Sequence, residues 1–220
     1  MGCRCVPLVV TSHPLRITHD MRIKNTLLLS CALVGLLTAG FNAPEAEPFA
    51  PPEAGTYVID AGHSCVLFKI KHMQLAYCYG RFDDFSGTIV IAEKVADTAV
   101  EFEIKTASVD SANEGRDRHI KGPDFLNVEE FPVATFKSTK VSQKKDVYTI
   151  TGDLTMHGVT QEASLDMGVV GSRDTGRGYK AGFEGTLEFD RTDFKVGSTF
   201  NDETLSEKMS LIISVETKRK

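Results

Sequence analysis

AVEFEIKTAS, residues 99–108, alternates apolar and polar side chains from Val100 to Lys105. In an extended chain, successive side chains point to opposite faces. Val100, Phe102 and Ile104 therefore share one face, and the charged residues between and after them share the other. This period of two predicts a half-buried β-strand with one face toward an apolar interior and one toward water.

The same alternation recurs along the chain from Thr56 onward. Its clearest runs are residues 63–71, 134–136, 148–156, 163–169, 183–189 and 211–215. Turn-forming residues separate these runs at 144–146, 171–178 and 201–203. Short helices are expected only at 72–76 and 117–125. About eight strands, each with one apolar face, predict an all-β domain built as a sandwich or a closed barrel.

Phenylalanine dominates the apolar face, since the chain has 13 Phe and no Trp. Phe68, Phe102, Phe136 and Phe183 lie on runs far apart in sequence, so many strands are expected to contribute rings to the apolar interior. A small barrel either fills its interior with side chains or encloses one small ligand. Both a filled core and a ligand cavity are compatible with this pattern.

The charge distribution excludes some partners. The chain has a formal net charge of -5, and its first forty residues are basic, so the remainder is more acidic still. Nucleic-acid binding needs clustered Lys and Arg, which this acidic body lacks. The same balance argues against electrostatic docking on anionic lipid.

The N-terminal region has the features of an export signal. Met21 opens a basic stretch and is a candidate for the true start, residues 27–39 are apolar, and small residues end at Gly40. The apolar run is too short for a membrane span, so the mature chain is expected to have none and to be periplasmic or secreted. The predicted organisation is a signal peptide at 1–40, a flexible linker at 41–55 and one barrel domain at 56–220.

Two cysteines, Cys65 and Cys78, remain after the leader. They lie on runs that would pair as a hairpin around residues 72–76, where an oxidising compartment would allow a disulfide. Two small buried thiols fit the sequence equally well, and both alternatives stay open.

Several motifs, taken in order, resemble the YceI family. They are YVIDAGHS at 57–64 with Phe68 and His72, GRF at 80–82 with FSG at 85–87, the connection from Arg116 to Phe136, LTMHGVT at 154–160 and RTDF at 191–194. The resemblance implies a lipocalin-like antiparallel barrel that is usually exported, often a homodimer, binds polyisoprenoid or related lipid and needs no cofactor. Leu126 and Lys195 depart from the family pattern, at positions where an aromatic residue and a glycine are common.

The candidate binding residues form an apolar set and a polar set. The apolar side chains expected to line the cavity are Val66, Phe68, Ile70, Phe82, Phe102, Phe136 and Phe183. Arg81, Arg116 and His119 are candidates for a lipid head group, because guanidinium and imidazolium donors suit a pyrophosphate. An internal ion pair between Arg116 and Asp117 that fixes the long connection is an equal alternative.

The sequence gives only weak indications of a catalytic or a metal-binding site. Asp60, His63 and Ser64 are residue types of a hydrolase triad, with His119 and His157 elsewhere, but no nucleophile elbow surrounds the serine. We interpret them as strand-end hydrogen-bonding groups. The histidines lack metal-ligand spacing, so no metal is expected.

The sequence therefore predicts a non-enzymatic, exported protein that sequesters or transports an amphiphilic isoprenoid lipid, polyprenyl or quinone-like. The alternatives are a lipid-directed hydrolase and a structural barrel with a filled core.

Overall fold

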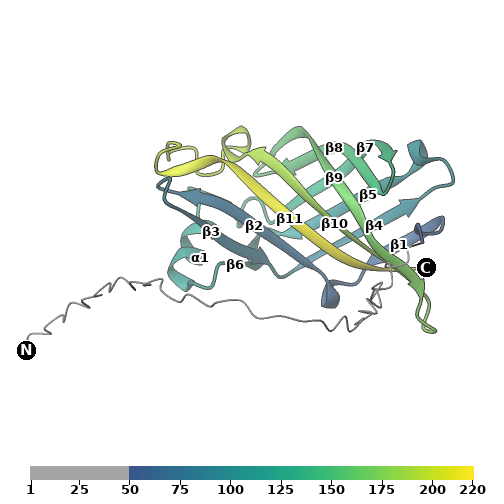
Figure 1. The fold of residues 1–220 in the computed structure, drawn as a ribbon. Coiled ribbons are helices and arrows are strands. Elements are labelled where there is room, and N and C mark those ends of the chain that lie inside the picture. The colour runs from purple at the N-terminus through teal and green to yellow at the C-terminus, as the bar shows by residue number, and fades with distance from the viewer. Residues whose placement is uncertain (1–49) are drawn as a thin grey trace, which may run out of the picture. The chain divides into compact units, whose positions relative to one another are not determined.

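A computed structural model describes residues 50–220, which form an all-β domain with one short α-helix (Figure 1). The strands are β1 Gly55–Ile59, β2 Cys65–His72, β3 Ala76–Phe82, β4 Phe85–Ile91, β5 Ala99–Lys105, β6 Val109–Asp110, β7 Val133–Lys144, β8 Val147–Met156, β9 Val159–Asp174, β10 Tyr179–Asp190 and β11 Leu205–Arg219. The helix is α1 Glu114–Lys121, and the 3-10 turns are η1 Ala61–His63, η2 Val95–Asp97, η3 Thr106–Ser108 and η4 Arg191–Phe194. The predicted signal peptide and residues 41–49 of the predicted linker lie outside the described residues.

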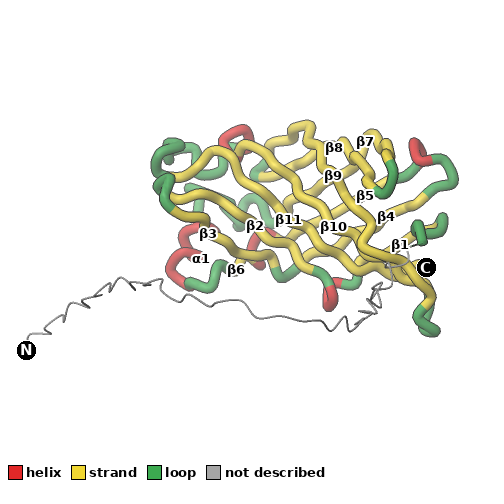
Figure 2. The backbone as a smooth tube through the Cα atoms, in the orientation of Figure 1, coloured by secondary structure: helices red, strands yellow, loops and turns green. Residues whose placement is uncertain are grey.

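Antiparallel pairing closes eight of these strands into a barrel (Figure 2). Their order around the sheet is β1-β4-β5-β7-β8-β9-β10-β11, and β1 then pairs with β11 through the register Tyr57↔Arg219. Closure leaves no free edge among these strands. The predicted lipocalin-like antiparallel barrel is confirmed.

One edge of β11 pairs with two different strands. Its last residues pair with β1, whereas the longer part from Leu205 to Ser214 pairs with β2. β2 then pairs with β3, and β3 pairs with the short β6. These extra strands and α1 lie together at one end of the barrel (Figure 1).

The strand periodicity is visible in the burial of β5. Val100 and Ile104 are buried, while Glu101 and Lys105 are exposed. Glu101 forms an ion pair with Lys137 of β7 at 2.9 Å on the outer surface. Phe102 is less buried than its two neighbours on the inner face, because the interior is hollow there.

The helix predictions need correction. Residues 72–76 form the β2–β3 hairpin turn: His72 pairs with Ala76, so the loop is the three residues 73–75, and Met73 and Gln74 have left-handed φ values of 51° and 55°. The α-helix begins three residues before the predicted segment and ends at Lys121. Asn113 caps it by accepting a hydrogen bond from the Arg116 amide at 2.9 Å.

The barrel interior has a filled end and a hollow end. Tyr57, Phe183 and Thr217 are 0, 2 and 0 % exposed and pack the end formed by β1 and the last residues of β11. The Thr217 hydroxyl donates to the Ala181 carbonyl at 2.8 Å, which satisfies its polar group in this core. The opposite end, beside β2, β3 and α1, contains the cavity described below. Within residues 50–220, no helix has the length and apolar character needed to cross a bilayer.

Candidate functional site

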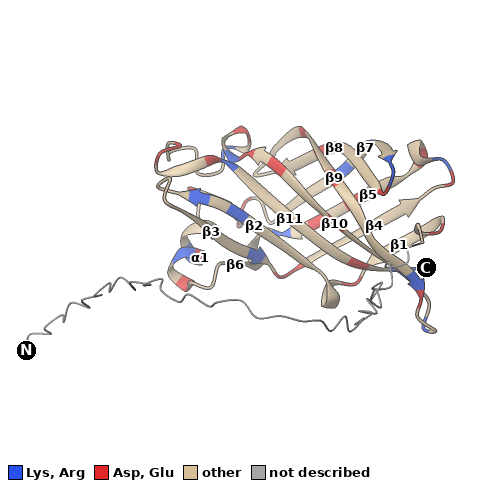
Figure 3. Cartoon of the chain, viewed as in Figure 1, with Lys and Arg blue, Asp and Glu red and all other residues tan. Residues whose placement is uncertain are grey.

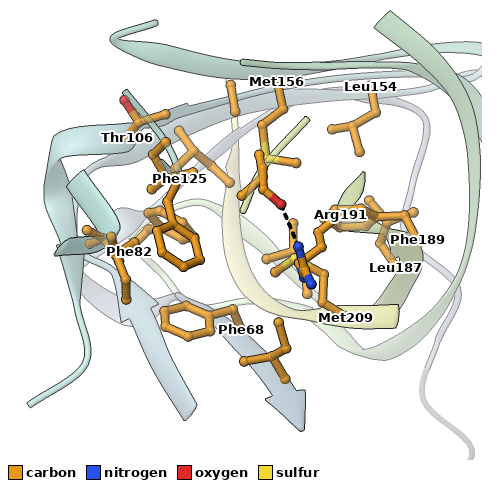
Figure 4. Close-up of a pocket in the computed structure, with 18 of the residues that line it drawn as sticks. Phe68, Phe82, Thr106, Phe125, Leu154, Met156, Leu187, Phe189, Arg191 and Met209 are labelled. Carbon is orange, nitrogen blue, oxygen red and sulfur yellow. Dashed lines mark hydrogen bonds between the residues drawn. The ribbon is translucent and has the colours of Figure 1, made fainter. Parts of the chain in front are cut away.

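A cavity of about 310 Å³ occupies the hollow end of the barrel. Its wall is almost entirely apolar and combines aromatic rings, aliphatic side chains and methionines (Figure 4). An apolar cavity of about half that volume stays dry and takes up small apolar molecules. The side chains labelled in Figure 4 are Phe68, Phe82, Thr106, Phe125, Leu154, Met156, Leu187, Phe189, Arg191 and Met209.

Most of the predicted apolar residues lie on this wall. The five that line the cavity are Phe68, Ile70, Phe82, Phe102 and Phe136. Gly80 lies opposite Phe68 in the β2–β3 pair, and a side chain there would collide with the Phe68 ring. The missing Cβ therefore lets that ring lie over β3, toward Phe82, with ring centroids 6.0 Å apart.

Val66 and Phe183 were predicted for the cavity but lie outside its lining. Both face the interior, as the alternation predicts, but they are 0 and 2 % exposed and are closely packed. Strand periodicity fixes the face on which a side chain lies and carries no information on its depth along the barrel axis. Phe183, paired with Val215, belongs to the filled end.

Arg81, predicted to contact a lipid head group, is placed on the outside of the barrel. Its Nε lies 2.8 Å from Asp83 and 3.6 Å from Asp110, and its side chain is 57 % exposed. It is on β3 next to Phe82, so alternation turns it away from the cavity. This ion pair explains the position of Arg81.

Arg116 lines the cavity and also holds the connection around α1. Its Nε donates to the Ser111 hydroxyl at 2.8 Å, and its terminal nitrogen donates to the Ser111 carbonyl at 2.5 Å. Asp117 accepts hydrogen bonds from the Ser111 amide and hydroxyl. The hydroxyl hydrogen bond is the main reason why the pKa of Asp117 is lowered. Both side chains thus fix the loop through Ser111. Within residues 50–220 no direct ion pair joins Arg116 to Asp117, so that form of the prediction is wrong, while Arg116 does lie on the cavity wall.

His119 belongs to an aromatic cluster at the mouth of the cavity. Its ring packs edge-on against Phe125 at 4.9 Å and against Phe200 at 6.1 Å, and the two phenylalanines stack at 5.3 Å. All three line the cavity. His119 Nε2 lies 3.7 Å from Asp124, at the exposed side of the cluster. The imidazole is therefore available both to the cavity and to solvent.

Arg191 is the main wall residue that the sequence did not identify as part of the site. It is 1 % exposed and lies on the cavity wall (Figure 4), and it donates five hydrogen bonds to backbone carbonyls. The acceptors are Ser206 at 2.9 Å, Val196 at 2.9 Å, Gly197 at 2.5 Å, Phe200 at 2.8 Å and Leu205 at 2.7 Å. All five guanidinium donors are thus used. Burial lowers the pKa of Arg191, while the charges of Glu207 and Asp202 act in the opposite direction. The guanidinium holds the 196–206 segment, which carries Phe200, against the cavity.

The two cysteines are free thiols in the structure. Cys78 pairs with Ile70 and lines the cavity, whereas Cys65 lies five positions further along β2 and pairs with Ser214. That offset is about 17 Å along a strand, while a disulfide needs Cα atoms about 4.4–6.8 Å apart. Alternation also places the two side chains on opposite faces of the sheet. The predicted hairpin exists, but its register excludes the disulfide alternative.

Asp60, His63 and Ser64 form a hydrogen-bonded cluster at the surface. The Ser64 hydroxyl donates to the Asp60 carbonyl at 2.7 Å and accepts from the Glu216 amide at 3.0 Å. His63 Nδ1 lies 3.0 Å from the Asp60 carboxylate, and this hydrogen bond is the main cause that lowers the pKa of Asp60. These backbone contacts give the serine a structural role, as interpreted from the sequence.

The same cluster includes the carboxylate of Glu216, whose oxygen lies within 4.8 Å of the ligand atoms of Asp60 and His63. Lys180 contacts both carboxylates, with its Nζ 3.6 Å from Asp60 and hydrogen-bonded to Glu216. The Lys180 ammonium group therefore already balances the charge of the two carboxylates that a metal cation would bind. His157, the remaining triad candidate, lies in the β8–β9 turn, and its ring packs against Phe131 at 4.5 Å.

A closed antiparallel barrel that is packed at one end and encloses an apolar cavity at the other is the architecture of a lipocalin-like binding protein. The YceI-like domain family matches residues 57–217. The chain belongs to the YceI-like family.

Known relatives agree with this assignment. The UPF0312 protein of Azotobacter vinelandii is 42% identical over 168 residues, covering 74% of this chain and 86% of the relative. The crystal structure of the YceI protein of Campylobacter jejuni is 32% identical with a TM-score of 0.63, covering 69% of this chain and 91% of that one. A polyisoprenoid-binding domain from Saccharophagus degradans shares the fold at 15% identity, with a TM-score of 0.59 and coverage of 76% and 100%.

The two departures from the family pattern have clear places in the structure. Leu126 is 6 % exposed and lines the cavity, so the smaller non-aromatic side chain shapes the cavity wall directly. Lys195 ends η4 with φ 60° and ψ 14°, a left-handed conformation that glycine adopts without steric cost. This backbone explains why glycine is common there.

Proposed function

We propose that this protein is an exported, non-enzymatic carrier that holds an isoprenoid lipid, polyprenyl or quinone-like, in its barrel cavity. The observation that carries the proposal is the apolar cavity of about 310 Å³, lined by side chains of the barrel strands, of α1 and of the neighbouring loops. The printed description of the Saccharophagus degradans domain as polyisoprenoid-binding supports the same ligand class.

The mechanism is burial of an apolar chain. Each methylene taken out of water contributes about 0.8 kcal/mol, and Phe102, Phe136 and Leu187 offer a continuous apolar surface to it. Polar groups gather near the mouth, where Arg116 and His119 lie. We propose that the head group rests there and that the isoprenoid tail extends toward the filled end of the barrel. Arg191 is saturated with carbonyl partners, so it acts by positioning the wall.

A cavity-filling variant tests this function. Ala134 is on β7 and lines the cavity, so Ala134→Phe would place a ring in the space proposed for the lipid. Thr139→Phe adds the same ring to the exposed surface of the same strand and serves as the matched control. The probe is geranylgeraniol, measured by equilibrium binding to delipidated protein. We expect Ala134→Phe to fold and lose binding while Thr139→Phe retains it. Unchanged binding by a folded Ala134→Phe protein would contradict the proposed site.

Export is the second part of the proposal and rests on the N-terminal sequence. Expressed in a Gram-negative cell, the mature protein should appear in the periplasmic fraction with its N-terminus near Phe41. Recovery only of full-length protein from the cytoplasm would contradict export.

A further inference from the structure

Exposed apolar side chains gather at the β2–β3 hairpin. Leu75 is 84% exposed, Met73 54%, Tyr79 52% and Tyr77 50%. They are four of the six large hydrophobic residues that are exposed within residues 50–220. Clustering of this kind on one turn and the strand that follows marks an interaction site more often than scattered single residues do.

Two lysines of β2 pair with the two tyrosines of β3 across the hairpin, and Figure 3 shows the basic positions on β2 in blue. Lys71 pairs with Tyr77 and Lys69 pairs with Tyr79 across the strands. The ammonium groups of Lys69 and Lys71 lie 4.2 and 5.6 Å from the centre of the Tyr77 ring. Tyrosine rings and long lysine side chains are the residues that occupy the headgroup level of a bilayer, with apolar side chains beyond them.

The inner face of the same hairpin is part of the cavity wall. Ile70, His72 and Cys78 line the cavity, and they alternate with the exposed residues along both strands. The Met73 amide donates to the Thr204 carbonyl at 2.9 Å, and Thr204 also lines the cavity. The exposed turn therefore stands next to the open end of the proposed lipid site.

We propose that the β2–β3 turn docks on a lipid bilayer, with Met73 and Leu75 inserted among the acyl chains and Tyr77 and Tyr79 at the headgroup level. The proposal rests on the proposed function, because a bilayer is where a long isoprenoid lipid resides. Docking at this turn brings the cavity mouth to the membrane surface, where a lipid can pass into the barrel without crossing water.

Apolar insertion, rather than attraction to anionic lipid, supplies the binding. The chain carries a net charge of -5, and Asp202, next to the turn, binds Gln74 through its backbone carbonyl at 2.7 Å. The Asp202 carboxylate, with its Oδ2 3.3 Å from Gln74 Nε2, places a negative charge beside this turn. Zwitterionic vesicles should bind almost as well as anionic ones.

A second copy of the chain is the rival occupant. A stable protein interface involves roughly 20–30 residues on each side. Here the apolar residues sit on the three-residue turn 73–75 and the strand that follows it, flanked by the polar Gln74–Asp202 contact. A small convex apolar tip suits insertion into a fluid bilayer better than a flat face of a dimer.

The absence of tryptophan from the sequence allows a direct test. Leu75→Trp places a single fluorophore at the turn, and Val170→Trp places one at a 53% exposed position on β9, at the filled end of the barrel. With phosphatidylcholine vesicles we expect a blue-shifted emission, quenched by brominated lipid, from Leu75→Trp only. Unchanged Leu75→Trp emission at high vesicle concentration would overturn the proposal. A blue shift that depends on protein concentration without vesicles would also overturn it, in favour of a second copy.

A variant that places a charge at the turn gives a quantitative test of vesicle binding. Leu75→Glu should lower the vesicle partition coefficient about tenfold or more, and Val170→Glu should leave it unchanged; tenfold corresponds to about 1.4 kcal/mol. Both should still bind geranylgeraniol supplied without vesicles, because neither position lines the cavity. Parent protein that binds this probe but not vesicles would defeat docking alone. Parent protein that fails to bind the probe would defeat the proposed function.

Discussion

Truncating one phenylalanine at each end of the barrel distinguishes the hollow end from the filled end. Phe102 lines the cavity and stacks on Phe85 with ring centroids 5.8 Å apart, so only part of its surface contacts protein. Phe183 is 2 % exposed and surrounded by packed side chains. Phe102→Ala and Phe183→Ala remove the same atoms from these two environments.

The expected losses differ because cavity creation depends on how many contacts the ring makes. A buried Phe→Ala change costs about 3–5 kcal/mol, and Phe183→Ala should fall in that range. Phe102 already borders empty space, so we expect about 1–2 kcal/mol for Phe102→Ala. At about 2–4 °C per kcal/mol for a domain of this size, the Tm should fall by about 6–20 °C and about 2–8 °C, respectively.

The assay is thermal unfolding of delipidated protein followed by circular dichroism, with geranylgeraniol binding measured alongside. Phe102→Ala should change probe affinity, and Phe183→Ala should leave it intact below its Tm. Equal and large losses of stability in the two variants, with no probe bound by the parent protein, would refute the hollow barrel and favour a filled one.

Three further predictions concern single positions. Arg191→Lys should lower the free energy of unfolding by about 3 kcal/mol or more, because an ammonium cannot replace all five charged hydrogen bonds; a urea titration that shows parental stability would contradict this. Lys195→Gly should raise the free energy of unfolding by about 0.5–1 kcal/mol, since φ is 60° at Lys195. The control Lys94→Gly should lower it, because φ is -102° there. The reverse order in urea titrations would argue against left-handed strain at Lys195. Under denaturing, non-reducing conditions, Cys65 and Cys78 should both react with a thiol reagent. In the native protein, bound geranylgeraniol should slow the labelling of Cys78 alone. Equal slowing at both cysteines would mean that the probe binds outside the cavity.

Periodicity was sufficient to predict an all-β domain of about eight strands and much of its interior, while the resemblance to the YceI family predicted a barrel rather than a sandwich. The alternation in residues 99–108 identified the inward face of β5, and the spread of phenylalanines over distant runs predicted an apolar interior to which many strands contribute. It could not separate Phe102 from Phe183, because alternation does not report depth along the barrel axis. Only the register between β10 and β11 places Phe183 at the filled end.

The role of Arg191 was hidden for a different reason. It lies in the RTDF motif at 191–194, yet its partners are backbone carbonyls of residues 196–206, which leave no mark in a side-chain pattern. The aromatic cluster at the mouth was missed in the same way, since Phe125 and Phe200 lie in loops without periodicity. Arg81 was misplaced because its residue type suited a head group, while its strand position turned it outward.

A carrier of the proposed kind holds an isoprenoid lipid in its cavity in the cell. The most direct measurement is solvent extraction of protein purified from its native host, followed by mass spectrometry, with the Ala134→Phe variant prepared in parallel. We expect one reproducible isoprenoid species, near one molecule per barrel, in the parent protein and its loss from the folded variant. A parent protein that yields no lipid, or a variant that retains the same lipid in the same amount, would contradict it.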